Sequence, residues 1–410
     1  MDRLARRLGV PDAVVIGLGS MLGAGVFVVF APATAAAGGS GLLAALVLAG
    51  FIAFCNATSS ARLAARYPES GGTYVYGRER LGPFSGFLAG WGFVVGKTAS
   101  CAAMALTIGA YLWPGQARLV AVLAVVAVTA VNLRGIGKTA AATRILVVLV
   151  LAVLALVAAT GASQVQLARL AEPPDGGRGV LTAAGLLFFA FAGYARVATL
   201  GEEVRDPQRT IPRAVPLALG VVLTIYLALA VIAVGVLGAD RLAASAAPLA
   251  DVVTAAGLPG LEWVVRAGAT VAVTGVLLSL LAGVGRTTLA MARHRDLPNA
   301  LAAVHPRYRV PARAELAVAV AVILVVALGD VRGAIGFSSV TVLVYYAITN
   351  AAALTLGREP SRKLPVHALA VAGLIGCVLL AVNLPLSSVL AGFGVLALGA
   401  VWYAFRSARR

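Results

Sequence analysis

The chain has 410 residues, of which 60% are hydrophobic and only 12% are charged, and its mean hydropathy is +0.95. An ordinary soluble domain carries about 25% charged residues, so this composition excludes a soluble globular fold, and it equally excludes intrinsic disorder. The formal net charge is +17, from 33 Lys and Arg residues against 16 Asp and Glu residues. In so apolar a chain, this excess is explained by basic cytoplasmic loops in a lipid bilayer and not by nucleic-acid binding.

Apolar stretches of membrane-spanning length recur from one end of the chain to the other. A bilayer-crossing helix needs about 20 residues, so we predict an all-α polytopic membrane protein with twelve transmembrane helices. Their predicted bounds are 12–36, 41–65, 84–112, 117–133, 140–161, 180–203, 212–237, 261–291, 315–329, 333–356, 365–382 and 386–405. The ninth segment is the shortest.

The basic residues divide unequally between the two sides that these helices define. With the N-terminus inside, 25 Lys and Arg residues fall at cytoplasmic ends and six at outer ends, while Lys97 and Arg196 lie in membrane segments. Because basic residues concentrate on the cytoplasmic side, we predict a multi-pass protein of the cytoplasmic (inner) membrane with both termini cytoplasmic.

The first predicted helix contains an interruption. Gly17, Gly19, Gly23 and Gly25 fall within nine residues, and each glycine weakens a helix by about 1 kcal/mol relative to alanine. Irregular backbone persists at membrane depth only where it lines a cavity or is buried in protein. The alternative is that the Gly19–Gly23 pair only lets another helix approach closely. A dinucleotide-binding turn is disfavoured, because Asp12 is followed by no acidic residue until Glu69.

A second interruption is predicted in the sixth helix, at Phe188–Tyr194 around Gly193. Helices one to five and six to ten form two halves of opposite orientation, and each half begins with an interrupted helix. Paired interruptions of this kind indicate a transporter binding site. Free backbone N–H groups at such a break bind a carboxylate, and free carbonyls accept hydrogen bonds from an ammonium group. A zwitterion therefore fits such a site without a charged side chain.

These segments resemble the amino acid–polyamine–organocation (APC) superfamily of permeases over roughly residues 10 to 356. The matching segments are 19–27, 63–76, 90–91, 132–135, 188–194, 202–212 and 292–298. The resemblance implies a LeuT-like 5+5 inverted repeat with broken helices 1 and 6 and two peripheral helices. The parts are then residues 1–161 (helices 1–5), 162–356 (helices 6–10) and 357–410 (helices 11–12 and the C-terminus).

The resemblance also implies a small-molecule substrate, an amino acid or a related amine. By position, the substrate carboxylate meets the amides of Gly23, Ala24 and Gly25, and its amino group meets the carbonyls of Met21, Phe189 and Ala192. The remaining candidates in the interrupted segments are Ser20, Phe191, Gly193 and Tyr194, and the two aromatic residues act either as gating side chains or in plain packing.

The chain departs from the family pattern where proton coupling is concerned. Ala195 and Arg196 stand where many relatives carry an acidic residue, Val150 stands where some carry a lysine, and Arg62 replaces an acidic residue. Lys97 lies instead about midway along the third helix, and a central lysine is costly enough to be a functional hypothesis. It is a candidate coupling residue, with a structural ammonium as the alternative. Protons or simple exchange are favoured over sodium.

Glu202, Glu203 and Arg205 at the cytoplasmic end of the sixth helix are candidates for a gate or a scaffold of ion pairs. No nucleophile, histidine cluster or metal set accompanies them, so an enzyme, a cofactor and a metal site are not predicted. We predict a secondary transporter, with a non-transporting membrane sensor or a channel-like protein as the alternative. No oligomeric state follows from the sequence.

The basic-residue distribution makes a topological prediction. The loop from Pro68 to Arg80 and both termini should be cytoplasmic. Single cysteines introduced into this loop should react with a membrane-impermeant thiol reagent only after the membrane is opened. Reaction of the loop from outside in intact cells would show that the predicted alternation of the helices is wrong.

Overall fold

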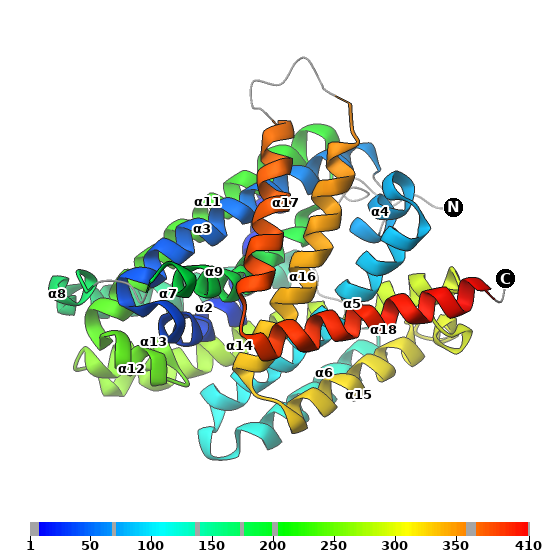
Figure 1. Ribbon diagram of the computed structural model, residues 1–410. Coiled ribbons are helices and arrows are strands. Elements are labelled where there is room, and N and C mark those ends of the chain that lie inside the picture. Colours follow the sequence, from blue (N-terminus) through cyan, green and yellow to red (C-terminus); the bar gives the residue numbers. More distant parts are fainter. Residues whose placement is uncertain are drawn as a thin grey trace.

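The computed structural model describes residues 8–67, 71–135, 140–172, 176–198, 204–357 and 366–408 (Figure 1). Within these ranges the fold is helical, and a bridge between Leu8 and Val204 is the one extended pairing. Eleven helical stretches in the described part of the chain are long and apolar enough to cross a membrane. The chain is therefore a multi-pass membrane protein, as predicted.

The helix bounds follow the predicted ones within a few residues at most ends. The longer helices are α1 (Val10–Met21), α3 (Phe30–Arg66), α5 (Pro83–Leu112), α6 (Ala117–Leu133), α7 (Ala140–Gly161), α9 (Gly177–Phe191), α11 (Pro207–Leu237), α14 (Glu262–Arg293), α15 (Ala312–Leu328), α16 (Val331–Leu354), α17 (Val366–Asn383) and α18 (Leu386–Ala408). The shorter ones are α2 (Ala24–Val28), α4 (Thr73–Leu81), α8 (Leu167–Leu170), α10 (Ala195–Ala198), α12 (Ala239–Ala244) and α13 (Pro248–Ala255). Five 3₁₀ turns are η1 (Pro114–Gln116), η2 (Ala162–Gln164), η3 (Ala192–Tyr194), η4 (Pro259–Leu261) and η5 (Asn299–Ala302). Helix α15 has 17 residues and is not among the eleven stretches.

Gly38 separates the first two predicted spans. Helix α3 has 37 residues, which is about 55 Å at 1.5 Å per residue and well beyond the roughly 30 Å of a bilayer core. At Gly38 the backbone leaves the helical region, with φ 73° and ψ −176°, a conformation that glycine adopts without steric cost. The chain therefore bends at the position predicted to be a loop, between residues 36 and 41.

Polar contacts join helix ends that are predicted to lie on the same side of the membrane. The predicted inner ends are joined by Arg144 to Asp12, by Arg80 to Thr355, and by the amide of Arg205 donating to the carbonyl of Leu8 at 2.8 Å. The predicted outer ends are joined by Arg266 to the carbonyls of Ala110 and Tyr111, by Arg118 to Gly329 and by Arg332 to Ala243. The helices therefore alternate in direction as expected, while the end that faces the cytoplasm stays a prediction.

Helix α5 is the most enclosed of the spans and packs against α4, α6, α14 and α16. Small residues allow this close packing: a Cβ at Gly90 would lie 2.9 Å from the sulfur of Met291 on α14, and Gly96 faces Thr341 on α16. Between α5 and α16, the hydroxyls of Ser100 and Ser338 are 2.7 Å apart. Hydrogen bonds and small residues of this kind are how helices associate in lipid.

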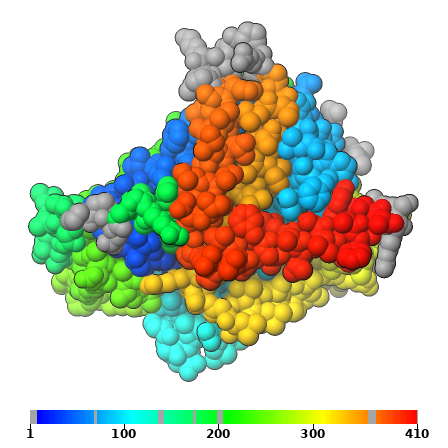
Figure 2. All heavy atoms as spheres, in the orientation of Figure 1, coloured from blue at the N-terminus to red at the C-terminus, as the bar shows by residue number. Residues whose placement is uncertain are grey.

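Helix α18 crosses the outside of the bundle. Figure 1 shows it running at a steep angle to α16 and α17, and Figure 2 shows it lying across this face of the molecule. Much of its surface is exposed, including Leu386, Leu390 and Phe405. These side chains suit contact with lipid tails, so α18 belongs to the periphery of the membrane-embedded fold.

A buried carboxylate holds α18 to the rest of the molecule. The side chain of Asp296 is fully enclosed and accepts hydrogen bonds from Tyr74 at 2.7 Å, from Arg78 at 3.0 Å and from Arg406 of α18. The indole of Trp402 donates to the backbone carbonyl of Asp296 at 3.0 Å. Burial and the bond to Asp296 raise the pKa of Tyr74 above its usual value, so its hydroxyl remains a donor at neutral pH.

The Asp296 network makes a prediction about stability. Replacing Asp296 with Asn keeps the shape but leaves Arg78 and Arg406 without their counter-charge, and breaking a buried ion pair costs about 3 kcal/mol. The melting temperature of the purified protein in detergent should therefore fall. The control Asp240→Asn alters an exposed carboxylate on α12 and should leave melting unchanged. Equal melting of the two variants would contradict the assigned role.

Candidate functional site

The predicted interruption of the first helix is present at Leu22 and Gly23. Helix α1 ends at Met21 and α2 begins at Ala24, and between them Leu22 (φ −77°, ψ 59°) and Gly23 (φ −123°, ψ −143°) are not helical. The amides at the start of α2 have no acceptor within their own helix. The break thus leaves backbone N–H groups without a helical acceptor in a fully buried part of the molecule.

The second interruption is milder than the sequence predicted. Helix α9 ends at Phe191 and continues into the 3₁₀ turn η3, and α10 resumes at Ala195. The backbone from Phe191 to Ala195 remains near the helical region. One glycine, Gly193, accompanies this 3₁₀ turn, whereas the four glycines of the first predicted span accompany a true break.

The two interruptions lie against each other. A Cβ at Gly25 would lie 2.5 Å from the Cα of Ala190 on α9, and a Cβ at Gly193 would overlap the carbonyl oxygen of Ser20 on α1. Neither glycine can carry a side chain unless the two backbones separate. Gly25 and Gly193, predicted as site residues, are therefore the points of direct contact between the two segments.

The other glycines of the first span serve helix packing. A Cβ at Gly19 would lie 2.9 Å from Val147 of α7, and one at Gly23 would lie 2.8 Å from Val276 of α14. The packing interpretation of the Gly19–Gly23 pair is therefore supported. For Gly23 it holds together with the break, because the same residue ends the irregular segment.

Two of the three predicted acceptor carbonyls, those of Met21 and Ala192, already accept hydrogen bonds. The carbonyl of Met21 accepts from the hydroxyl of Tyr226 at 2.7 Å and from the amide of Gly23 at 2.8 Å. Tyr226, on α11, also reaches the carbonyl of Ala190 at 3.2 Å, while Tyr346 of α16 donates to that of Ala192 at 3.4 Å. In this structure, tyrosine hydroxyls therefore occupy two of the carbonyls that were predicted to bind the substrate amino group.

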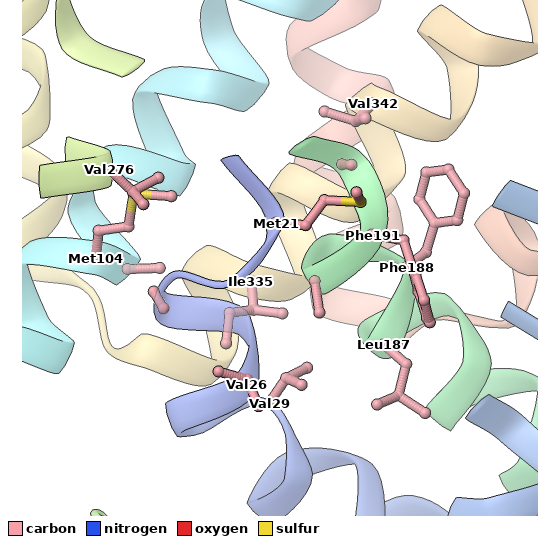
Figure 3. Close-up of a cluster of buried hydrophobic side chains, with 14 of the residues drawn as sticks. Met21, Val26, Val29, Met104, Leu187, Phe188, Phe191, Val276, Ile335 and Val342 are labelled. Carbon is pink, nitrogen blue, oxygen red and sulfur yellow. The ribbon is translucent and has the colours of Figure 1, made fainter. Parts of the chain in front are cut away.

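A closed cluster of apolar side chains surrounds the interruptions (Figure 3). Its labelled members come from α1, α2, α5, α9, α14 and α16 and from the residue between α2 and α3: Met21, Val26, Val29, Met104, Leu187, Phe188, Phe191, Val276, Ile335 and Val342. The hydroxyl of Ser20, a predicted site residue, donates to the carbonyl of Ile16 in its own helix at 2.8 Å. The immediate surroundings of the break therefore present apolar atoms.

The predicted aromatic residues divide into buried and partly buried ones. Phe191 packs on Tyr226 with ring centres 5.3 Å apart, and Tyr194 packs on Tyr346 at 5.2 Å. Both are fully buried, whereas Phe189 is partly exposed. Phe191 and Tyr194 thus pack against the same two helices whose tyrosines cap the interruption, and a gating role stays a prediction.

Lys97 lies within α5 and retains 8% of its surface. Gly90 precedes Lys97 by seven residues, and Met104 follows it by seven. Seven residues are about two helical turns, so all three residues share one face of α5. Gly90 contacts α14 and Met104 belongs to the central cluster, which directs this face toward the interior. Among the described residues no ion pair is formed by Lys97.

Of the predicted gate, Glu202 and Glu203 lie outside the described residues. Arg205 is exposed, and its contact is made by its backbone amide with Leu8. In the described part of the chain, no three His, Cys, Asp or Glu side chains lie close enough to hold a metal ion.

Sequence reasoning missed two tyrosines that donate to backbone carbonyls on either side of the α1–α2 break. Tyr226 binds Met21 and Ala190, and the hydroxyl of Tyr111 on α5 donates to the carbonyl of Phe27 at 2.7 Å. Both lie inside apolar spans, where a phenolic hydroxyl needs a partner. A tyrosine within an apolar span therefore predicts a buried hydrogen bond from the sequence alone, but it does not identify the acceptor.

Comparison with known proteins gives consistent matches. The family model for amino acid permeases matches residues 12–357. An uncharacterized transporter of Mycobacterium tuberculosis is 62% identical over 408 residues, covering 99% of this chain and 92% of that protein. A methylthioribose transporter and a branched-chain amino acid permease, both of Bacillus subtilis, are each 26% identical over 333 residues, covering 76% and 75% of this chain and 72% and 71% of those proteins.

The contact between Gly193 and α1 makes a prediction. Gly193→Ala places a methyl group against the carbonyl of Ser20, and overpacking of this kind costs about 1–3 kcal/mol. The variant should melt at a lower temperature than the unaltered protein. Gly220→Ala is the control, because a Cβ there meets nothing within 4 Å. If both variants melt alike, the interruptions do not touch as described.

Proposed function

Because the chain belongs to the amino acid permease family, we propose that it is a secondary transporter that carries amino acids across the cytoplasmic membrane by alternating access. The observation that carries the proposal is the direct contact between the interrupted α1–α2 segment and the α9–η3 segment at Gly25 and Gly193. Paired interruptions in corresponding helices are the feature that transporters use to bind a substrate near the membrane midplane.

The proposal includes the inverted repeat. Counting the bend at Gly38 as a boundary and α15 as a span gives twelve crossings: five in residues 1–161, five in 162–356 and two in 357–410. On this assignment α1–α2 and α9–α10 open the two halves. Helices α17 and α18 are then the peripheral pair, in keeping with the exposed surface of α18.

The binding step follows from the backbone groups at the break. The substrate carboxylate would accept hydrogen bonds from the amides of Gly23, Ala24 and Gly25, where the partial positive charge of a helix start adds attraction. The ammonium group would take the carbonyl of Met21 from the Tyr226 hydroxyl, and the amide of Gly23, which now donates to the same carbonyl, would turn to the carboxylate. Binding thus replaces two hydrogen bonds, and it requires α11 to move where Tyr226 now bridges Met21 and Ala190.

Lys97 is the proposed coupling residue. An ammonium at this depth is costly unless it is paired, hydrated or neutral, and the described residues provide no ion pair. Lys97 shares this face of α5 with Met104 of the central cluster, so a proton on Lys97 would lie on the same side of the helix as the proposed substrate path, about two helical turns from Met104. Sodium is less favoured, because Ser279 of α14 points outward and bonds to Gly275 in its own helix at 3.3 Å.

Uptake into proteoliposomes tests the proposal. With one proton coupled, a gradient of one pH unit sustains about tenfold accumulation, since each tenfold is 1.4 kcal/mol. The unaltered protein should therefore accumulate a radiolabelled amino acid, whereas Lys97→Met should reach only equal concentrations inside and outside while still exchanging substrate.

The outcomes separate the alternatives. Accumulation by Lys97→Met equal to that of the unaltered protein across pH 5 to 8 would assign Lys97 a structural role. Specific binding of an amino acid without any movement across the membrane would favour a sensor over a transporter. Empty liposomes and liposomes with heat-denatured protein are the controls.

A further inference from the structure

Resting on the proposed function, we infer that the transported amino acid has an uncharged aliphatic or thioether side chain, received between Met104 of α5 and Val276 of α14. Three observations carry this inference: the position of these residues beside the break, the accessible surface that they keep, and the bonds that already engage the nearby hydroxyls.

Met104 and Val276 face each other beside the break. Helices α5 and α14 run antiparallel, because Gly90 meets Met291 at one end and the carbonyls of Ala110 and Tyr111 meet Arg266 at the other. This register brings Met104 opposite Val276. Figure 3 shows both on the side of the α1–α2 connection that faces away from Phe188 and Phe191.

Val276 also lies directly against the segment proposed to hold the carboxylate. Its Cγ2 is 2.8 Å from the position of a Cβ at Gly23. A substrate whose carboxylate reached the Gly23–Gly25 amides would project its side chain toward α5 and α14, since the opposite side at Gly25 is closed by the backbone of Ala190.

Met104 and Val276 are less tightly enclosed than their neighbours. They keep 8% and 7% of their surfaces accessible, whereas Ala105, Val273 and Leu277 beside them on the same helices keep none. A methionine side chain is flexible and fills irregular gaps. A change of the Met104 rotamer is therefore the step that would make room for a substrate side chain without a change in the backbone.

The hydroxyls near this space are already bonded to backbone carbonyls. Ser20 bonds to Ile16, Thr107 of α5 bonds to Ala103 at 2.7 Å, and Tyr111 bonds to Phe27. With their protons engaged, these hydroxyls offer only acceptor lone pairs. The carboxylate or amide oxygen of a polar substrate side chain would therefore lose its water and find no donor in exchange, which opposes its binding.

Charged side chains are opposed more strongly. Lys97 is the charged residue of this α5 face, and it lies about 10 Å from Met104 along the helix. Helical side chains lean toward the N-terminus of their helix, so its ammonium is directed away from Met104. Neither a cationic nor an anionic substrate side chain would therefore find a counter-charge in contact with it at Met104, and burying an unpaired charge is costly.

The test compares ligands of nearly equal size. Leucine, asparagine and aspartate have similar shapes but differ in polarity, so their dissociation constants, measured by calorimetry on the purified full-length protein, report polarity rather than volume. Leucine should bind at least about thirtyfold more tightly than asparagine or aspartate, which corresponds to about 2 kcal/mol. Methionine should bind and lysine should not.

A matched pair of variants locates the subsite. Val276→Thr keeps the shape and adds a hydroxyl, and it should weaken leucine binding by about tenfold and narrow the preference over asparagine. Val271→Thr makes the same change on the same helix at a half-exposed position and should bind leucine as the unaltered protein does. Melting without ligand confirms that both variants are folded.

Each contrary result has its own meaning. Binding of asparagine, aspartate or lysine as tight as that of leucine would overturn the side-chain class while leaving amino acid transport intact. A preference for leucine that Val276→Thr does not change would overturn the location. Binding of no amino acid at all would instead overturn the proposed function.

Discussion

The backbone groups freed by the break in α1 must be satisfied inside an apolar interior, and the neighbouring helices are arranged around that requirement. A membrane core offers no water to replace a lost helical hydrogen bond. For the carbonyls, the structure supplies Tyr226 from α11, which donates to Met21 of α1 and Ala190 of α9, and at the second interruption Tyr346 from α16, which donates to Ala192 of η3. Helices distant in sequence are thereby tied to the interruption through two phenolic hydroxyls.

The same requirement explains why the two interruptions have to touch. Gly25 and Gly193 bring backbone against backbone, which excludes lipid and shields the free groups from contact with hydrocarbon. The apolar cluster of Figure 3 then covers what remains. A break that would be unstable alone becomes part of a closed core because the second segment and its tyrosines complete it.

Much of this fold could be predicted from local sequence. Spans were found because hydrophobicity over about 20 residues is a strong and short-range signal, and the bend at Gly38 fell within a predicted loop. The α1 break was predictable for the same reason, since its glycines are neighbours in the chain. The small helices α4, α12 and α13 were missed, because they lie in connections where hydrophobicity carries no information.

The partners of polar side chains could not be predicted. Tyr226 is 205 residues from Met21, and Asp296 is 222 residues from Tyr74 and 110 from Arg406. Composition and periodicity describe each segment separately, whereas such pairs depend on how the helices pack. The sequence predicted acceptor carbonyls at Met21, Phe189 and Ala192, but the bonds from Tyr226 to Met21 and from Tyr346 to Ala192 depend on the three-dimensional arrangement.

The anchoring of α18 also has a consequence for the order in which the molecule is completed. During synthesis, Tyr74, Arg78 and Asp296 are all made before Arg406, which follows Asp296 by 110 residues. The first three partners are therefore available to one another before Trp402 and Arg406 of the last helix exist. Hydrogen bonds and an ion pair near its C-terminal end therefore attach α18 to the bundle, and its exposed apolar side chains face the surrounding lipid.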